Sequence, residues 1–498
     1  MNKYKASLFN YLFNSINAIV VIINGIIMVP IYFKFISVST YGAWLATGNV
    51  VGMLGLVESG FASVITQKMS IAIADKDRET FFQLASANIY TAIFMFFGLL
   101  IIGLPIYPFI ADWINVDESI KHPITIAYII SLVSAAISLF VSLIGAFPQV
   151  WQETKSVGII ATCVNILGIC SLIVFLNLGY GVVSLALGYI TRGILNFLGQ
   201  GLWILKGWQR KGLSFPEFNK DMILELIRDC FYPFLSKISG VLMVNSQSFI
   251  IALFLNPTIA AIYDITSKIS VVACNFLNMA NGSFFAFFSL TFASKNLIEI
   301  NKVVKNISII FITILVTVLV YSAVFSRPVV GFWVGLDKFG GNLLLILIVF
   351  SLLVTQLKQY FNSLLYSGGL INVSAKLDVI SMILYVVLVL FFIGYLKVYA
   401  LPIASIFSGG IFLRWYIKLL NNKLDVTVKP MLSLLLRLII FTIPFVLIHY
   451  LLNFNLLDIK YFAYYSVFFS IFYFTLLFIL NRQFFIELLH KLNYGLQK

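Results

Sequence analysis

The sequence predicts an all-α polytopic membrane protein with about 14 transmembrane helices, in two parallel six-helix lobes and a C-terminal helix pair. The first observation is composition: 61% of the 498 residues are hydrophobic and 10% are charged, whereas soluble domains average about 45–50% and about 25%. Long continuous apolar runs exclude a water-soluble enzyme, a nucleic-acid-binding module and a disordered chain. They also disfavour an outer-membrane barrel, whose short strands alternate apolar and polar residues. The other two observations are alternating basic loops and an internal repeat.

The apolar runs predict the spans one by one. The first run follows Lys3 and Lys5, has full span length and lacks a small-x-small cleavage site, so we expect it to persist as the first helix. The tight connections at 177–181, 256–258 and 396–400 are expected to be turns, because merging their flanking spans would give helices far too long for a bilayer. In chain order, the expected spans are 9–33, 42–66, 82–110, 123–148, 157–177, 181–205, 233–256, 258–292, 307–325, 342–367, 377–396, 400–420, 431–452 and 461–480.

The basic residues predict the orientation. With both termini placed in the cytoplasm, 21 of the 33 Lys and Arg residues fall in inside segments, six in outside segments and six within spans. Lys and Arg accumulate in cytoplasmic loops of membrane proteins, so this bias predicts cytoplasmic termini and an even number of spans. The same rule explains the net charge of +14 without invoking nucleic acid. All seven Trp residues fall near expected span ends, where interfacial rings are favoured.

An internal repeat of about 220 residues divides the chain. The pattern P-x4-W-x3-D occurs at Pro108, Trp113 and Asp117 and recurs at the corresponding residues of 328–337. Further matches at nearly the same offset pair Tyr41 with Tyr263, Gly60 with Gly282, Lys155 with Lys376, Gly188 with Gly410 and Arg192 with Arg414. Each half then holds six spans and enters from the same side, as in transporters with parallel repeats. We expect an N-lobe over 1–205, a cytoplasmic linker with an amphipathic segment over 206–232, a C-lobe over 233–420, two further spans over 431–480 and a cytoplasmic tail over 481–498.

Charges inside the spans predict the kind of passenger. A charge at the bilayer centre costs at least about 2.5 kcal/mol, so it must face protein or water. Basic residues outnumber acidic ones there, which favours an anionic passenger held by ammonium and guanidinium groups. The candidates for this cationic site are Lys268, Lys358, Lys237, Arg192 and Arg414. Lys237 can instead reach the interface, and the duplicated Arg192 and Arg414 can instead serve a structural role common to both lobes.

Two acidic residues are candidates for ion coupling. Glu58 precedes Ser59 and Gly60 in the second span, and a carboxylate there suits a proton or Na⁺ site. Asp264 stands one helical turn before Lys268, and the alternative is a neutral i,i+4 pair that only aids insertion. We expect no metal and no cofactor beyond a coupling H⁺ or Na⁺. The chain lacks a G-x4-G-K-[ST] phosphate loop, and its three His residues have no metal-ligand spacing.

The first two spans resemble a known family. Residues 29–67 contain Pro30 at the end of the first span, Tyr41-Gly42-Ala43-Trp44 at the start of the second and Glu58-Ser59-Gly60 near its end. This pattern is similar to the opening signature of bacterial polysaccharide biosynthesis proteins, the O-antigen and lipid-linked oligosaccharide flippases. These belong to the multidrug/oligosaccharidyl-lipid/polysaccharide exporter superfamily.

The resemblance implies a function. A family member carries an undecaprenyl-diphosphate-linked sugar unit, such as an O-antigen repeat for lipopolysaccharide, between the leaflets of the bacterial inner membrane by alternating access. Its partners would be that lipid-linked oligosaccharide, membrane lipids and other polysaccharide assembly proteins. The resemblance also implies a cationic central cavity lined by spans 1, 2, 7 and 8, on which Glu58, Lys237, Asp264 and Lys268 fall. Two alternatives remain: a multidrug exporter of the same superfamily, usually with twelve spans and acidic cavities, and a membrane glycan polymerase. The expectation is a carrier, an antiporter if ion-coupled, and no enzyme, because a polymerase would carry a sizeable external loop.

Overall fold

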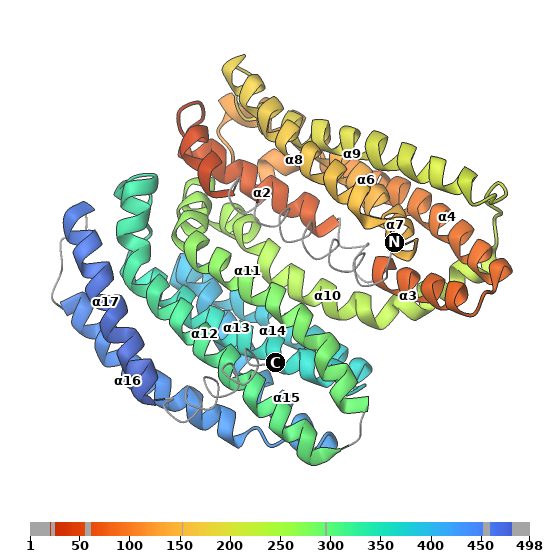
Figure 1. The fold of residues 1–498 in the computed structure, drawn as a ribbon. Coiled ribbons are helices and arrows are strands. Elements are labelled where there is room, and N and C mark those ends of the chain that lie inside the picture. The colour runs from red at the N-terminus through yellow and green to blue at the C-terminus, as the bar shows by residue number, and fades with distance from the viewer. Residues whose placement is uncertain are drawn as a thin grey trace. The chain divides into compact units, whose positions relative to one another are not determined.

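The computed structural model describes residues 20, 25–54, 61–151, 153–293, 296–451 and 459–480. Within these ranges every regular element is a helix, which confirms the all-α fold class (Figure 1). The α-helices are α2 (Val38–Leu54), α3 (Phe61–Ala74), α4 (Arg78–Gly103), α5 (Ile110–Trp113), α6 (Glu118–Ile144), α7 (Ala146–Val150), α8 (Thr154–Asn177), α9 (Val183–Arg210), α10 (Lys220–Phe254), α11 (Pro257–Ala293), α12 (Leu297–Trp333), α13 (Asn342–Ser367), α14 (Ile371–Leu396), α15 (Ala400–Lys423), α16 (Lys429–Leu451) and α17 (Ile459–Leu480).

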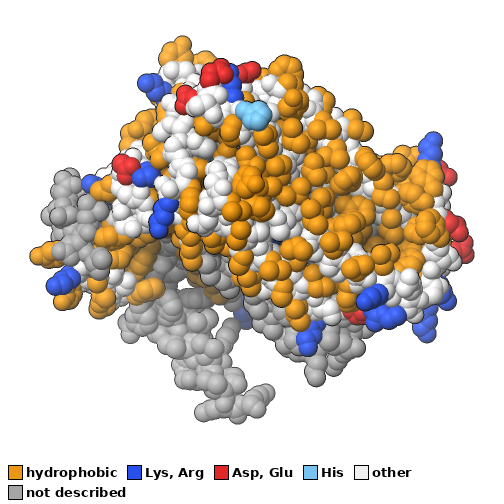
Figure 2. Space-filling view, turned by 90° about the horizontal axis from the view of Figure 1, so that it is seen from above, with side chains coloured by type: hydrophobic (Ala, Val, Ile, Leu, Met, Phe, Trp, Pro, Cys, Tyr) orange, Lys and Arg blue, Asp and Glu red, His pale blue; other side chains and the backbone are white. Residues whose placement is uncertain are grey.

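The surface of the helices is that of a membrane protein. Among the described residues, seven helical stretches are long and apolar enough to cross a bilayer. Large apolar side chains point outward, among them Ile101 and Phe391 with about 70% and 67% of their surface exposed. Hydrophobic side chains cover most of the face seen in Figure 2, and charged side chains gather toward its margins. Apolar surface on this scale is stable only against lipid.

The three tight connections are turns, as predicted. After α8, Gly179 and Gly181 adopt φ of +85° and +53°, a conformation that residues with a Cβ rarely take. After α10, Pro257 is the first residue of α11, where its missing N–H costs nothing. After α14, the short 3₁₀ helix Lys397–Tyr399 begins at a residue with φ of +50°. These breaks divide segments that would otherwise form single helices far too long for a bilayer.

The segment 206–232, predicted as a cytoplasmic linker with an amphipathic segment, is mostly helical, and its role as a linker stays a prediction. Helix α9 continues to Arg210, and α10 begins at Lys220, far ahead of the expected start at 233. Asn219 caps α10 by accepting a hydrogen bond from the backbone N–H of Met222 at 3.1 Å. At 35 residues, α10 is about 52 Å long by its helical rise, so its charged first turns extend beyond an about 30 Å hydrocarbon core.

Charged residues fasten the polar end of α10 to α3. Lys68 Nζ lies 2.7 Å from Glu225 Oε1 and also contacts Asp229. At the opposite end, Asn115 Nδ2 donates to the backbone carbonyl oxygens of Ala252 and Leu253 at 3.1 and 2.8 Å. Both ends of α10 are therefore held by residues of the first half of the chain.

A carboxylate also caps α4. Asp77 accepts hydrogen bonds from the hydroxyl and the backbone N–H of Thr80, at 2.6 and 3.0 Å. These two bonds hold the pKa of the Asp77 carboxyl below its ordinary value, because they stabilise the ionised form. The charge suits the positive end of the helix dipole.

The chain divides into two compact units. The first contains residues 1–265 and 357–416, and the second contains 266–356 and 417–498. In the first, α6 packs against α4 and α9, α9 packs against α8, and α10 packs against α2 and α14. In the second, α12 packs against α16 (Figure 1). These units do not coincide with the expected lobes over 1–205 and 233–420, which stay a prediction.

The repeated P-x4-W-x3-D pattern occupies the same kind of place twice. Trp113 ends α5 after α4, and Asp117 is the N-cap residue of α6. Pro328 and Trp333 lie in the last turns of α12, and Asp337 lies in the 3₁₀ helix just before α13. In both halves the pattern therefore marks the exit from the third long helix and the entry to the fourth.

Candidate functional site

The Tyr-Gly-x-Trp segment at the start of α2 packs against the start of α11. An ideal Cβ added to Gly42 would lie 1.7 Å from the backbone oxygen of Pro257, so only glycine permits this approach. Beside it, the buried Tyr41 hydroxyl donates to Asp264 Oδ2 at 3.3 Å. Asp264, predicted from sequence as a coupling acid, thus has a defined partner on α2.

Removing the Tyr41 hydroxyl is expected to weaken this junction. In Tyr41→Phe the ring packing stays and the hydrogen bond to the Asp264 carboxylate is lost, which costs about 1.5 kcal/mol of unfolding free energy. Thermal unfolding of the purified protein would show a lower midpoint than in the wild type. Tyr107→Phe is the matched control, because that hydroxyl belongs to an exposed side chain. Equal midpoints for all three proteins would contradict the proposed contribution.

Trp44, the last residue of the Tyr-Gly-x-Trp segment, belongs to a cluster of two aromatic rings and a guanidinium group. Trp44 and Tyr189 of α9 have ring centroids 5.8 Å apart. Arg192 Cζ lies 5.1 Å from the centroid of the Tyr189 ring, a cation–π contact. Within the described part of the chain, Arg192 Nε is buried without a hydrogen-bond partner. Its repeat counterpart Arg414 is instead exposed on α15, so the two arginines have unlike surroundings.

Lys358 lies in a buried polar network of α13, α14 and α15. Only 7% of the Lys358 surface is exposed, and its Nζ lies 3.3 Å from Asp378 Oδ1. The ammonium also donates to Ser381 Oγ at 2.9 Å. The Asp378 carboxylate accepts from the Tyr416 hydroxyl at 2.7 Å and from Asn362 Nδ2 at 2.8 Å. Each charge is therefore compensated, as a buried ion pair requires.

Sequence reasoning missed Asp378 as the partner of Lys358. It treated Glu58 and Asp264 as the two acidic residues inside the spans, although Asp378 falls within the expected span 377–396. A carboxylate within an apolar run was the signal by which the sequence could have identified Asp378. The excess of bases over acids in the spans is smaller by one charge than the sequence reading assumed.

The other predicted site residues are placed as follows. Lys268 lies on α11 one turn after Asp264, and both side chains are half-buried. The predicted ion pair between them stays a prediction. Lys237 belongs to α10, but its side chain lies outside the described part of the structure, and Glu58 lies outside the described residues.

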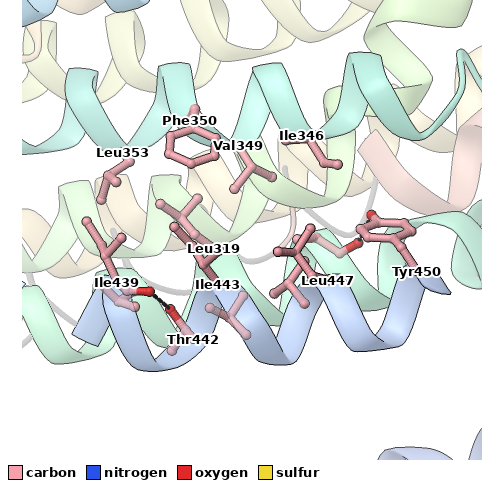
Figure 3. A pocket seen from close by; sticks show the side chains of 14 residues that line it. Leu319, Ile346, Val349, Phe350, Leu353, Ile439, Thr442, Ile443, Leu447 and Tyr450 are labelled. Carbon is pink, nitrogen blue, oxygen red and sulfur yellow. Dashed lines mark hydrogen bonds between the residues drawn. The ribbon is translucent and has the colours of Figure 1, made fainter. Parts of the chain in front are cut away.

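An apolar groove runs between α12, α13 and α16. It has a volume of about 160 Å³. Figure 3 shows Leu319 of α12, Phe350 of α13 and Ile443 of α16 facing one another across it. The polar contributions are few: the Thr442 hydroxyl donates to the Leu438 carbonyl of its own helix, and the Tyr450 hydroxyl to the Ala323 carbonyl. With its polar groups satisfied internally, the groove suits a hydrocarbon chain.

A second hollow, in the first unit, is larger and more polar. It has a volume of about 590 Å³ and lies between α2, α6 and α9. Serine hydroxyls of α6, the Asn49 amide and the rings of Trp44 and Tyr189 line it. The hollows of the described part of the structure therefore include an apolar groove and a hydroxyl-lined hollow of different character.

Comparisons with known proteins identify a matching family and solved structures with a similar fold. A family model described as polysaccharide biosynthesis protein matches residues 7–292. The solved structure of the lipid II flippase MurJ in an inward closed conformation has a TM-score of 0.68 and 14% identity, covering 94% of this chain and 100% of that chain. No curated protein matches the sequence.

Multidrug transporters share the fold as well. An inward-facing multidrug resistance MATE family transporter of the MOP superfamily has a TM-score of 0.62 and 13% identity, covering 81% of this chain and 94% of that chain. A mutant of the Vibrio cholerae MATE transporter VcmN has a TM-score of 0.59 and 14% identity, covering 84% of this chain and 98% of that chain. At such identities the likeness establishes the fold alone.

Proposed function

The chain belongs to the polysaccharide biosynthesis protein family, and on that basis we propose that it is a flippase for undecaprenyl-diphosphate-linked oligosaccharide. Its cargo would be an O-antigen or similar surface-polysaccharide repeat unit, carried from the cytoplasmic to the outer leaflet of the bacterial plasma membrane by alternating access. Both termini would be cytoplasmic, and other polysaccharide assembly proteins would supply and consume the lipid-linked unit.

The observation that carries this proposal is the apolar groove beside α16. Helices α16 and α17 contain 23 and 22 residues and follow the expected twelve spans of the two lobes. The match to the lipid II flippase covers 94% of this chain, so the uncovered part is shorter than α16 and α17 together. The match therefore includes part of these two helices. The likeness to the MATE transporters covers less of the chain. A polyprenyl tail needs an apolar path beside the polar carrier, and the groove suits that role.

Cations within the spans would hold the diphosphate. Lys268 and Lys237 lie on the helices that correspond to expected spans 8 and 7, and Arg192 has a buried Nε without a partner among the described residues. Ammonium and guanidinium groups bind phosphate oxygens through charge-assisted hydrogen bonds. Lys358 and Arg414 are weaker candidates, since Asp378 neutralises Lys358 and Arg414 is exposed on α15.

A carboxylate would couple the cycle to H⁺ or Na⁺. Asp264 is the better-defined candidate, because Tyr41 on α2 donates a hydrogen bond to it and protonation would weaken that contact. Glu58 remains the second candidate. Replacing either carboxylate by its amide, in Asp264→Asn or Glu58→Gln, should abolish ion-coupled transport while the protein still folds and inserts.

Complementation tests the function directly. A strain lacking its own O-antigen flippase, but retaining the transferases and the polymerase, is given the full chain and its surface polysaccharide is measured. We expect surface glycan to return. If glycan stays absent while the protein is present in the membrane, this cargo is wrong. Resistance to cationic dyes under the same conditions would then favour the multidrug exporter, which the MATE likeness supports.

Polar substitutions in the groove are expected to impair transport. Ile443→Ser with Leu447→Ser removes apolar surface that would contact the lipid tail, at about 0.8 kcal/mol per methylene. We expect at least about a tenfold loss in transport rate in vesicles. The matched control is Leu436→Ser with Ile440→Ser, on the same helix but outside the groove lining. Equal losses in both double variants would indicate a general defect of α16 instead.

A further inference from the structure

The hollow between α2, α6 and α9 is built from two complementary helix faces. Ser131, Ser134, Ser138 and Ser142 follow one another at spacings of three and four residues, which places them on one face of α6. Opposite them, Gly48 and Gly52 on α2 leave the wall without side chains. A Cβ added to Gly48 would meet nothing within 4 Å. The volume of about 590 Å³ is within the range of small-molecule sites.

One buried hydroxyl of this hollow lacks a partner. Ser131 is 7% exposed, and its Oγ has no hydrogen-bond partner in the part of the chain that the structure describes. Other hydroxyls of these helices donate to a carbonyl one turn back, as Thr125 and Thr191 do. Leaving a buried hydroxyl unpaired costs about 1–3 kcal/mol. A ligand hydroxyl or carbonyl in the hollow would remove that cost.

Two aromatic rings, those of Trp44 and Tyr189, also line the hollow. Trp44 is almost fully buried, whereas 45% of the Tyr189 surface is exposed. The Arg192 guanidinium over the Tyr189 ring fixes that ring in place. A ring beside hydroxyl and amide groups offers both an apolar surface and hydrogen bonds, which is what an amphipathic polar ring requires.

The lining excludes other ligand classes. Among the described residues, none of the side chains that line the hollow is a carboxylate or an ammonium, so they offer a cationic drug or a metal ion no counter-charge. A polyprenyl tail would leave the serines and Asn49 unpaired, and the groove beside α16 offers it a better match. The remaining class is a neutral, hydroxyl-rich ring.

We propose that this hollow, lined by the Ser131–Ser142 face of α6, Asn49, Trp44 and Tyr189, binds a neutral sugar ring of the lipid-linked cargo. The inference rests on the proposed flippase function and adds a binding site that recognises the sugar itself. The serines and Asn49 hydrogen-bond its hydroxyl groups, and its C–H face packs on the Tyr189 ring.

The test compares two lipids on the purified full chain in nanodiscs. One is undecaprenyl diphosphate, and the other is the same lipid bearing one sugar, drawn from glucose, galactose, N-acetylglucosamine and N-acetylgalactosamine. We expect the wild type to bind at least one sugar-bearing lipid about tenfold more tightly than the bare lipid. Ser138→Leu fills the hollow from an exposed position and should reduce that ratio to about one. Ser131→Ala should reduce it several-fold.

The control is Cys170→Leu, which places the same side chain on an exposed position of α8, outside the lining. It should keep the wild-type ratio. Equal affinities of the wild type for the bare lipid and all four sugar-bearing lipids would overturn the sugar site and leave a water-filled hollow. An unchanged ratio in Ser138→Leu would overturn it as well. Failure to bind any of the lipids, together with failed complementation, would instead overturn the flippase function.

Discussion

Lys358→Met is expected to destabilise the protein strongly. The substitution leaves the buried Asp378 carboxyl with hydrogen bonds from Tyr416 and Asn362 but no counter-charge. Removing one partner of a buried pair costs about 3–5 kcal/mol, because the other charge stays uncompensated. Thermal unfolding in detergent should show a clearly lower midpoint. Arg414→Met, which removes an exposed cation from α15, should leave the midpoint unchanged.

A double variant distinguishes a structural pair from a substrate contact. Adding Asp378→Asn to Lys358→Met neutralises the orphaned charge, so stability should return in part and the two effects should not add. The competing prediction is that Lys358 holds the diphosphate. In that case Lys358→Met would abolish transport at a wild-type unfolding midpoint, and the second substitution would restore nothing. The two outcomes are separated by measuring unfolding and transport on the same preparations.

Gly42→Ala is expected to prevent close packing of α2 on α11. The added Cβ would lie 1.7 Å from the Pro257 oxygen and 2.5 Å from its carbonyl carbon. Both are backbone atoms, so relief requires the two helices to separate, at a cost of about 3 kcal/mol. That separation would also lengthen the contact between Tyr41 and Asp264. We expect less protein in the membrane and a lower unfolding midpoint.

The control for Gly42 is Gly98→Ala in α4, where a Cβ would meet nothing within 4 Å. Alanine there should stabilise slightly, because it favours the helix and restricts the unfolded chain. If Gly42→Ala matched Gly98→Ala in level and midpoint, the close approach of α2 to Pro257 would be wrong. The packing of α2 against Pro257 would then not explain the Tyr-Gly-x-Trp pattern.

Two helices could be predicted almost residue by residue. The expected 342–367 coincides with α13, and 258–292 nearly coincides with α11. The predictions were worst where a helix leaves the membrane: α10 starts at Lys220 and α12 at Leu297, not at 233 and 307. Hydropathy detects only the apolar part of a helix, whereas caps such as Asn219 and Asn296 define its beginning.

The candidate site was predictable only in part. The Tyr41 and Gly42 pattern pointed to the right place, but its partners Asp264 and Pro257 lie more than 200 residues away. Arg192 was a candidate from its charge, and the Tyr189 ring that it contacts stands three residues earlier on α9, a spacing that the sequence already shows. The serines of α6 carried no charge to mark them, although their spacing of three and four residues was visible.

The amino-acid sequence by itself determined that this chain lies in a membrane, the order of its helices and its family. These properties depend on the free energy of transferring each residue into lipid and on local patterns, so they are read along the chain. Only the tertiary structure decided that Asp378 neutralises Lys358, that the serines of α6 face Gly48 and Gly52, and that an apolar groove lies beside α16. These features depend on which helix faces meet, because the group that faces a charge or hydroxyl in the membrane decides whether it is neutralised or hydrogen-bonded.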